Sequence, residues 1–155
     1  MPHTNKDATA QFEAVEKLLT GWLRERRELL GKYTEIVVAS DSPIDPATLS
    51  GRQKALCELL VDYTSAGHFE IFHELLEEAE SFADGSSALA EKVIPAIGDT
   101  TEVILAYEEK YSDGSGENRK LKRDLSALGE TLESRFVLED QLIAGLHNSH
   151  RRQLD

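Results

Sequence analysis

The stretch LLVDYTSAGHFEIFHELLEEAE, residues 59–80, sets the fold class of this chain. Its apolar residues recur about every three or four positions, which is the period of an amphipathic helix. Gly67 interrupts it, although a mid-helix glycine costs about 1 kcal/mol relative to alanine. The glycine therefore predicts either a close approach by a neighbouring helix or partner side chain, or a bend between Ala66 and His68.

Helical runs of the same kind cover most of the chain. They span about residues 8–38, 52–83, 87–112 and 118–149, each with apolar residues at helical spacing. Pro95 lies inside the third run and predicts a kink or break there, because proline removes one helical hydrogen bond. We therefore predict an all-α fold, an antiparallel four-helix bundle with a kink or break near Pro95 and a further one near Gly67.

The connections between these runs are short and rich in turn-forming residues. They are SDSPIDPATLSG at 40–51, DGSS at 84–87, which ends the second run and supplies an N-cap for the third, and SDGSGEN at 112–118, a predicted mobile linker. Nothing divides the chain further, so residues 1–155 are predicted to form a single helical domain. We expect residues 1–8 and 150–155 to be frayed.

The composition is that of a globular protein. The chain has 155 residues, 40% hydrophobic and 30% charged, and its apolar runs are too short to span a membrane. The start, MPHTNKDATA, has no apolar segment of the kind found in secretory signals. The single cysteine, Cys57, is predicted to be a small buried residue, and a cytoplasmic location fits these features.

The net charge of −12 limits the possible partners. Direct binding to nucleic acid or to an anionic membrane is disfavoured, because both reward basic surfaces. An acidic protein can instead attract a basic protein, including a nucleic-acid-binding module. Simple solubility explains the charge equally well at this point.

Charged residues interrupt the apolar stripes at four positions: Arg26, Arg135, Glu139 and Asp62. An unpaired charge inside a bundle costs several kcal/mol, roughly, so these side chains should pair. We predict a polar network with Ser65 and His68 nearby. The network serves either to fix the helix register alone or to form a polar cavity that receives a side chain of a partner.

Catalytic and metal-binding motifs are weak. The chain has one E-x-x-H, Glu70 to His73, whereas a di-iron bundle needs two together with further carboxylates. His68 and His73 point about 140° apart on a helix. His147 and His150 share one face, but they lie in the C-terminal turn, at the start of the segment expected to fray. The acidic residues Glu70, Glu74, Glu77, Glu78 and Glu80 are predicted to cover a solvated outer face. We expect no enzymatic activity and no cofactor.

Three segments together resemble a known family. LLVDYTSAGHFEIFHELL (59–76), LESRFVLEDQLI (132–143) and WLRERRELL (22–30) are similar to the Rsd/AlgQ family, bacterial regulators of the primary sigma factor of RNA polymerase. The resemblance runs with interruptions from about Trp22 to His147. It implies an all-helical anti-sigma factor that binds region 4 of the primary sigma factor, the region that contacts the −35 promoter element, typically as growth slows.

The resemblance also suggests a binding mode. Asp62 and Glu139 would accept a basic side chain of sigma, with Arg26 and Arg135 holding these carboxylates in place. Trp22, Phe69 and Phe136 would be apolar anchors, with Ser65 and His68 beside them. The alternatives are a metal-binding helical bundle and a regulatory adaptor that docks another enzyme or a phosphocarrier protein.

Overall fold

The computed structural model describes residues 2–40, 45–113 and 120–154, with the side chains of residues 2–7 left out. Every regular element in these ranges is helical. The elements are α1 (Pro2–Ser40), α2 (Pro46–Ala66), the π-helix η1 (Gly67–Ile71), α3 (Phe72–Phe82), α4 (Ser87–Tyr111), α5 (Leu121–Leu146) and the 3-10 helix η3 (Asn148–Leu154). Most of the predicted linker at 112–118 lies outside the described residues.

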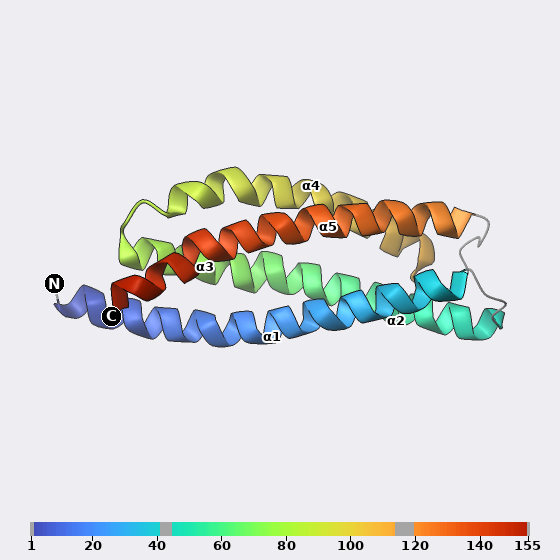
Figure 1. Ribbon diagram of the computed structural model, residues 1–155, viewed down its shortest axis with the longest axis horizontal. Coiled ribbons are helices and arrows are strands. Elements are labelled where there is room, and N and C mark those ends of the chain that lie inside the picture. The colour runs from blue at the N-terminus through green and yellow to red at the C-terminus, as the bar shows by residue number, and fades with distance from the viewer. Residues whose placement is uncertain (1, 41–44, 114–119, 155) are drawn as a thin grey trace.

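The helices form an elongated antiparallel bundle (Figure 1). α1 runs along the molecule, α2, η1 and α3 return beside it as one interrupted helix, and α4 and α5 form the second antiparallel pair. The N- and C-termini consequently lie at the same end. The predicted all-α bundle and the break near Gly67 are confirmed.

The core follows the predicted apolar stripes and runs the length of the bundle. Its fully buried side chains include Leu29, Ile36, Leu56, Leu60, Leu75, Ile97, Ile104, Leu128 and Leu132. Each contributes about 1.5–3 kcal/mol by leaving water. Cys57 is buried among them, as predicted. None of the described helices has a segment apolar and long enough to cross a membrane.

Local sequence explains where the helices begin and end. Asp45 caps α2, because its carboxylate accepts a hydrogen bond of 3.2 Å from the Thr48 amide, and Pro46 follows at the first helical position. α3 ends at Phe82, and its C-cap residue Ala83 has a left-handed φ of 52°. Ser86 lies at the N-cap of α4, but its side chain makes no capping bond. The hydroxyl instead lies 3.2 Å from His150 Nε2.

Two expectations about irregular segments can now be compared with the structure. Of the kink or break predicted near Pro95, the break is absent, because α4 continues through Pro95 from Ser87 to Tyr111, and the helix is curved in Figure 1. Residues 148–154, part of which was expected to fray, form η3, and His150 within it is fully buried. The polar contacts of His150 hold this segment against the bundle.

Candidate functional site

A buried ion pair lies at the middle of the bundle. Arg135 and Glu139, one turn apart on α5, are 1% and 0% exposed, and Arg135 Nε donates to Glu139 Oε2 at 2.9 Å. The same guanidinium donates to Thr101 Oγ1 at 2.7 Å and Thr100 Oγ1 at 3.2 Å on α4. The prediction that charges on the apolar stripes should pair is confirmed for these two residues, which are spaced i, i+4.

α1 and α2 complete this network from the other side. Tyr63 on α2 donates its hydroxyl hydrogen to Glu139. Arg26 on α1 places Nη1 2.9 Å from Asp140 Oδ1 and 3.5 Å from Glu139 Oε1. Because burial disfavours the ionised forms, it raises the pKa of the Tyr63 hydroxyl and that of the Glu139 carboxyl, the latter against the effect of Arg135. The network therefore ties together all four long helical segments.

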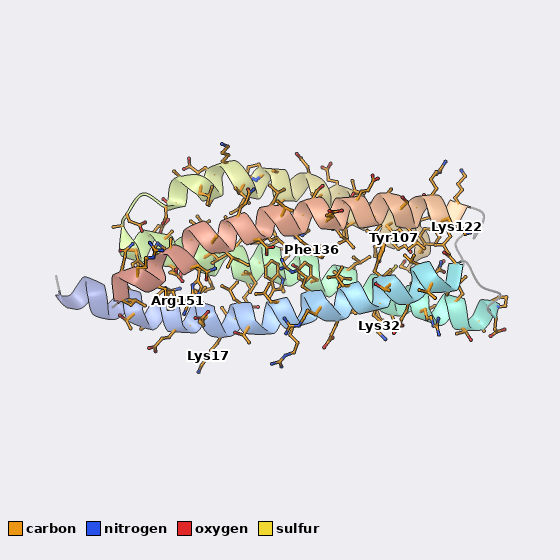
Figure 2. The ribbon with its side chains drawn as sticks, in the orientation of Figure 1. Lys17, Lys32, Tyr107, Lys122, Phe136 and Arg151 are labelled. Carbon is orange, nitrogen blue, oxygen red and sulfur yellow. The ribbon has the colours of Figure 1, made fainter. Side chains whose placement is uncertain are left out.

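Aromatic rings pack around the network. The Trp22 indole stacks on Tyr63 with centroids 4.7 Å apart, and its Nε1 donates to the Tyr63 carbonyl at 3.2 Å. Phe136 meets Tyr63 edge-on at 6.1 Å and lies under the Arg26 guanidinium at 4.9 Å. Figure 2 shows the half-buried Phe136 between α5 and α1. Trp22 is 3% exposed, so in this structure it is a core residue, not a surface anchor.

Asp62, Ser65 and His68 do not join the network, contrary to the prediction. All three are exposed. The buried stripe of this segment passes instead through Leu56, Leu60, Tyr63, Gly67 and Ile71. Tyr63 occupies the inward position that we assigned to its neighbour Asp62, and Asp140 is the second acidic partner of Arg26.

Asp62, Ser65 and His68 lie on an outer face together with Phe69. Asp62, Ser65 and Phe69 follow one another at steps of three and four, so they share one side of the helical segment. Phe69 is 77% exposed, and the His68 ring meets it edge-on at 4.7 Å. We call Asp62, Ser65, His68 and Phe69 the Phe69 face.

The π-helix positions this face. η1 begins at Gly67, where an added Cβ would come within 3.0 Å of the Trp22 indole. The glycine thus allows α1 to pack closely against this segment. This is the close approach by a neighbouring helix that the sequence predicted as one of two explanations for Gly67. Single-turn π-helices within an α-helix often mark functional sites. Here the widened turn displays Phe69 on its outside.

The E-x-x-H motif is on the surface. Glu70 and His73 are both exposed, and His73 Nε2 pairs with Glu77 at 3.1 Å. Within the described residues, His73, Glu74 and Glu77 have ligand atoms within 4.8 Å of one another. This group does not include Glu70, and exposed acidic groups of this kind are common without an ion. It lends no support to a di-iron centre.

A second buried polar cluster was missed by the sequence analysis. Glu78 on α3 and His147 and His150 at the end of the chain are fully buried and in mutual contact. Glu78 therefore does not belong to the solvated acidic face, where we had placed it. Its position three residues after the core residue Leu75 was the available signal.

Comparison with known proteins decides the family. Residues 1–147 match the family model described as "Regulator of RNA polymerase sigma(70) subunit, Rsd/AlgQ". The chain belongs to the Rsd/AlgQ family. No solved structure matches significantly.

Named relatives agree with the assignment to Rsd/AlgQ. Regulator of sigma D from Yersinia pseudotuberculosis serotype O:1b (strain IP 31758) is 33% identical over 143 residues, covering 87% of this chain and 82% of that protein. The protein of the same name from Yersinia enterocolitica serotype O:8 / biotype 1B is 35% identical over 141 residues, covering 87% and 83%. The one from Shigella boydii serotype 4 is 35% identical over 141 residues, covering 87% of each.

Proposed function

We propose that this protein binds region 4 of the primary sigma factor and thereby reduces the use of that factor by RNA polymerase. The family description and the name Regulator of sigma D carried by its relatives support a sigma-directed role. Region 4 is the part of sigma that the family resemblance implies. The protein acts by occupying a surface, without catalysis and without a cofactor, in the cytoplasm where RNA polymerase works.

Charge supports this choice of partner. A helix-turn-helix that contacts DNA presents basic side chains toward the phosphates. A chain with a net charge of −12 offers a complementary surface, which raises the association rate and favours this partner over acidic ones. The same charge disfavours direct binding of this protein to promoter DNA or to an anionic membrane.

The single observation that carries the proposal is the exposure of Phe69. A phenylalanine that is 77% exposed on a helical face leaves a large apolar surface in water. Aromatic side chains of this kind are enriched among residues that dominate binding energy. Asp62 lies two helical turns away on the same face, where it can accept a hydrogen bond from a basic side chain of sigma at the rim.

The buried network has a different role in this proposal. Glu139 is 0% exposed and already accepts hydrogen bonds from Arg135 and Tyr63, so it has no free face for a sigma side chain. Trp22, Arg26 and Phe136 pack on or pair within the same network. We propose that these residues fix the position of α2, and with it the Phe69 face, relative to α1 and α5.

The test is a binding titration with purified region 4, using variants of the Phe69 face. Phe69→Ala should weaken binding by about 30-fold or more, since loss of a central aromatic anchor costs about 2 kcal/mol. Asp62→Asn should act mainly on the association rate and its dependence on salt. Val38→Ala is the matched control, because Val38 is an apolar residue on α1 that is 62% exposed.

The possible results of this titration test the proposed function and the Phe69 face separately. Absence of any complex between the wild-type protein and sigma at micromolar concentration contradicts the proposed function. Normal binding by Phe69→Ala and Asp62→Asn variants contradicts the Phe69 face and leaves the function standing. An equal loss in the Val38→Ala variant would also argue against a specific face.

A further inference from the structure

The outer face of α1 carries a heptad pattern that does not contribute to the core of the bundle. Its exposed residues follow one another at alternating steps of three and four, and they are Ala14, Lys17, Gly21, Arg24, Glu28, Gly31, Glu35 and Val38. This spacing keeps them on one side of the helix, as in the contact between the helices of a coiled coil. In Figure 2, Lys17 extends from the side of α1 that faces away from the other helices. We call these eight residues the α1 seam.

The charged residues of the α1 seam have few partners within the molecule. Lys17, Arg24 and Glu28 form no ion pair with any residue that the structure describes. Arg24 and Glu28 remain unpaired although they lie one turn apart. Glu35 lies 3.9 Å from the Lys32 amine, and both side chains are exposed, so this contact contributes little. The charges of the seam are therefore available to a second molecule.

Two copies of the α1 seam are complementary when the helices lie antiparallel. The seam is symmetric about Arg26, so a two-fold axis there places each residue opposite another that is equally far from the axis. The resulting pairs are Lys17 with Glu35, Arg24 with Glu28, Gly21 with Gly31, and Ala14 with Val38. Both charged pairs join opposite charges, and each pair occurs twice in the dimer. A parallel arrangement would instead place like charges opposite each other, which is unfavourable.

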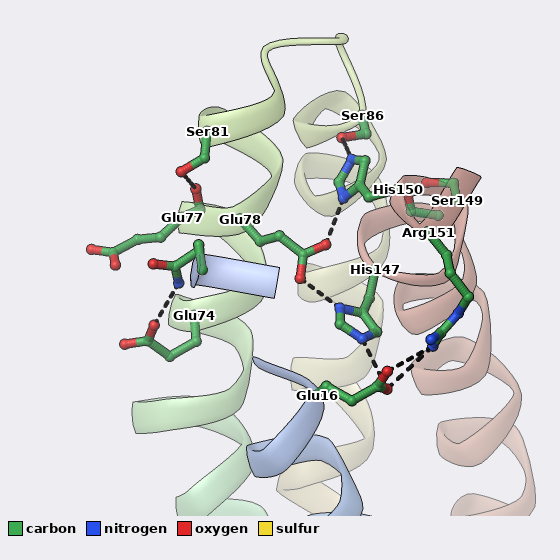
Figure 3. Close-up of polar contacts among 12 residues, drawn as sticks. Glu16, Glu74, Glu77, Glu78, Ser81, Ser86, His147, Ser149, His150 and Arg151 are labelled. Atoms are coloured by element: carbon green, nitrogen blue, oxygen red, sulfur yellow. Dashed lines mark hydrogen bonds and ion pairs between the residues drawn. The ribbon is translucent and has the colours of Figure 1, made fainter. Parts of the chain in front are cut away.

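The net charge of α1 allows two copies of this acidic protein to meet with little repulsion. The helix holds six basic and six acidic residues, whereas the whole chain has a net charge of −12. The excess negative charge therefore lies on other parts of the chain. Glu16, an acid of α1 outside the seam, has its own partner within the bundle, Arg151 at 2.8 Å (Figure 3).

The glycines of the seam favour a close approach of two helices. A Cβ at Gly21 or at Gly31 would meet no described atom within 4 Å, although each glycine costs about 1 kcal/mol relative to alanine inside a helix. Beside Gly31 lies an open, mainly apolar groove, which is lined by Leu30, Gly31, Thr34, Glu35, Val38 and Arg52. Val38 is 62% exposed and Leu30 is 42% exposed. In the antiparallel arrangement Gly21 of the second copy lies against Gly31 and brings its helix over this groove.

We propose that the protein forms an antiparallel homodimer through the α1 seam. The contact is a strip about 37 Å long and about 10 Å wide, which is small for a specific interface. Glu25 and Arg27 flank the seam close to the axis, where each lies near its own copy, and these like charges oppose association. The dimer is therefore weak, with a dissociation constant on the order of 10 μM. Sigma binding, when titrated at lower protein concentration, involves the monomer, so failure of either proposal leaves the other standing.

Sedimentation equilibrium of the wild-type protein alone tests whether it associates. The mass should be that of one chain, 17.2 kDa, at low concentration. It should rise toward twice this value between about 1 μM and about 300 μM, as expected for a dissociation constant in this range. The mass of a single chain at every concentration would overturn the proposal.

Charge reversal tests the seam and its direction. Arg24→Glu or Glu28→Arg alone should raise the dissociation constant about 10-fold or more, because either change places like charges opposite each other at two points. An equal mixture of the two variants should form a heterodimer, because every charged pair then again joins opposite charges. Self-association of either variant at the strength of the wild type contradicts the seam. Failure of the mixture to associate contradicts the antiparallel register.

Two variants on α4 provide matched controls. Lys92→Glu changes the net charge as Arg24→Glu does, and Glu102→Arg changes it as Glu28→Arg does. Both positions are exposed, and both variants should associate like the wild type. An equal loss of association in these controls would show that net charge, not the α1 seam, governs self-association, and would overturn the proposal.

Discussion

The Trp22 indole packs directly against Gly67, so that a Cβ at Gly67 would come within 3.0 Å of indole Cζ2. The indole cannot move away easily, because it stacks on Tyr63 and meets Phe72 edge-on at 5.8 Å. It also donates a hydrogen bond from Nε1 to the Tyr63 carbonyl. The contact between α1 and η1 therefore favours glycine at this position.

Gly67→Ala should destabilise the protein by about 1–2 kcal/mol. Overpacking costs about 1–3 kcal/mol, which exceeds the helix propensity that alanine gains. The measurement is urea unfolding followed by the fluorescence of Trp22, the single tryptophan of the chain. Gly98→Ala on α4 is the control, since a Cβ there meets nothing within 4 Å. It should be neutral or stabilising, and an equal loss of stability in both variants would argue against the contact.

The four helical runs could be predicted because each has a long apolar stripe and ends near Pro, Gly or Ser. Which side of a run faces inward was harder to predict. Leu59, Asp62, Ala66 and Phe69 follow the helical spacing as well as Leu56, Leu60, Tyr63 and Gly67 do. Glycine has no side chain to mark the buried face, and the polar end of Tyr63 finds its partner only on another helix. The buried face was therefore assigned wrongly.

Tertiary contacts also explain why the burial of Glu78 and His147 was not predicted. Glu78 and His147 lie 69 positions apart in sequence, so no local spacing relates them. The pairing of Arg135 with Glu139 was predictable because both lie on one helix at i, i+4. Local patterns identify charges that need partners, whereas the fold decides which distant residues supply them.

Removing the charge of one member of the Arg135–Glu139 pair should lower the free energy of unfolding substantially. Glu139→Gln keeps an amide oxygen that can accept a hydrogen bond, but it leaves the buried Arg135 guanidinium with uncharged partners only, among them the threonine hydroxyls of α4. Loss of one partner of a buried ion pair costs about 3–5 kcal/mol. The free energy of unfolding in urea measures this loss.

Replacing both members should cost less than the sum of the single changes. In Arg135→Met with Glu139→Leu no charge of the pair remains buried, and such exchanges are often neutral. Tyr63 would still lose its acceptor, so a residual cost of about 1–2 kcal/mol is expected. Strictly additive costs would show that the two side chains do not interact energetically.

Cys57 should react slowly with thiol reagents. Burial, and next the negative charge of Glu108, raise the pKa of its thiol to about 12. At about pH 8 the thiolate fraction is then on the order of a thousandfold below that of a free cysteine. Labelling by a disulfide reagent should therefore be limited by unfolding and accelerate in urea. Fast labelling of the folded protein would show that Cys57 is accessible.

Asp84 should contribute to stability against acid. Burial alone would raise its pKa, but hydrogen bonds from Ser86 and Gln153 and the charge of His150 lower it to about 2. A depressed carboxyl pKa gives stability that is present above the unfolded value of about 4 and lost as pH falls toward 2. Because the side chain is 27% exposed, solvent screening limits the effect to about 1 kcal/mol.

Asp84→Asn should flatten the stability profile between these pH values, whereas Asp99→Asn on the exposed side of α4 should leave it unchanged. An identical profile for wild type and Asp84→Asn would mean that the contacts of Asp84 with the turn and η3 add nothing to stability.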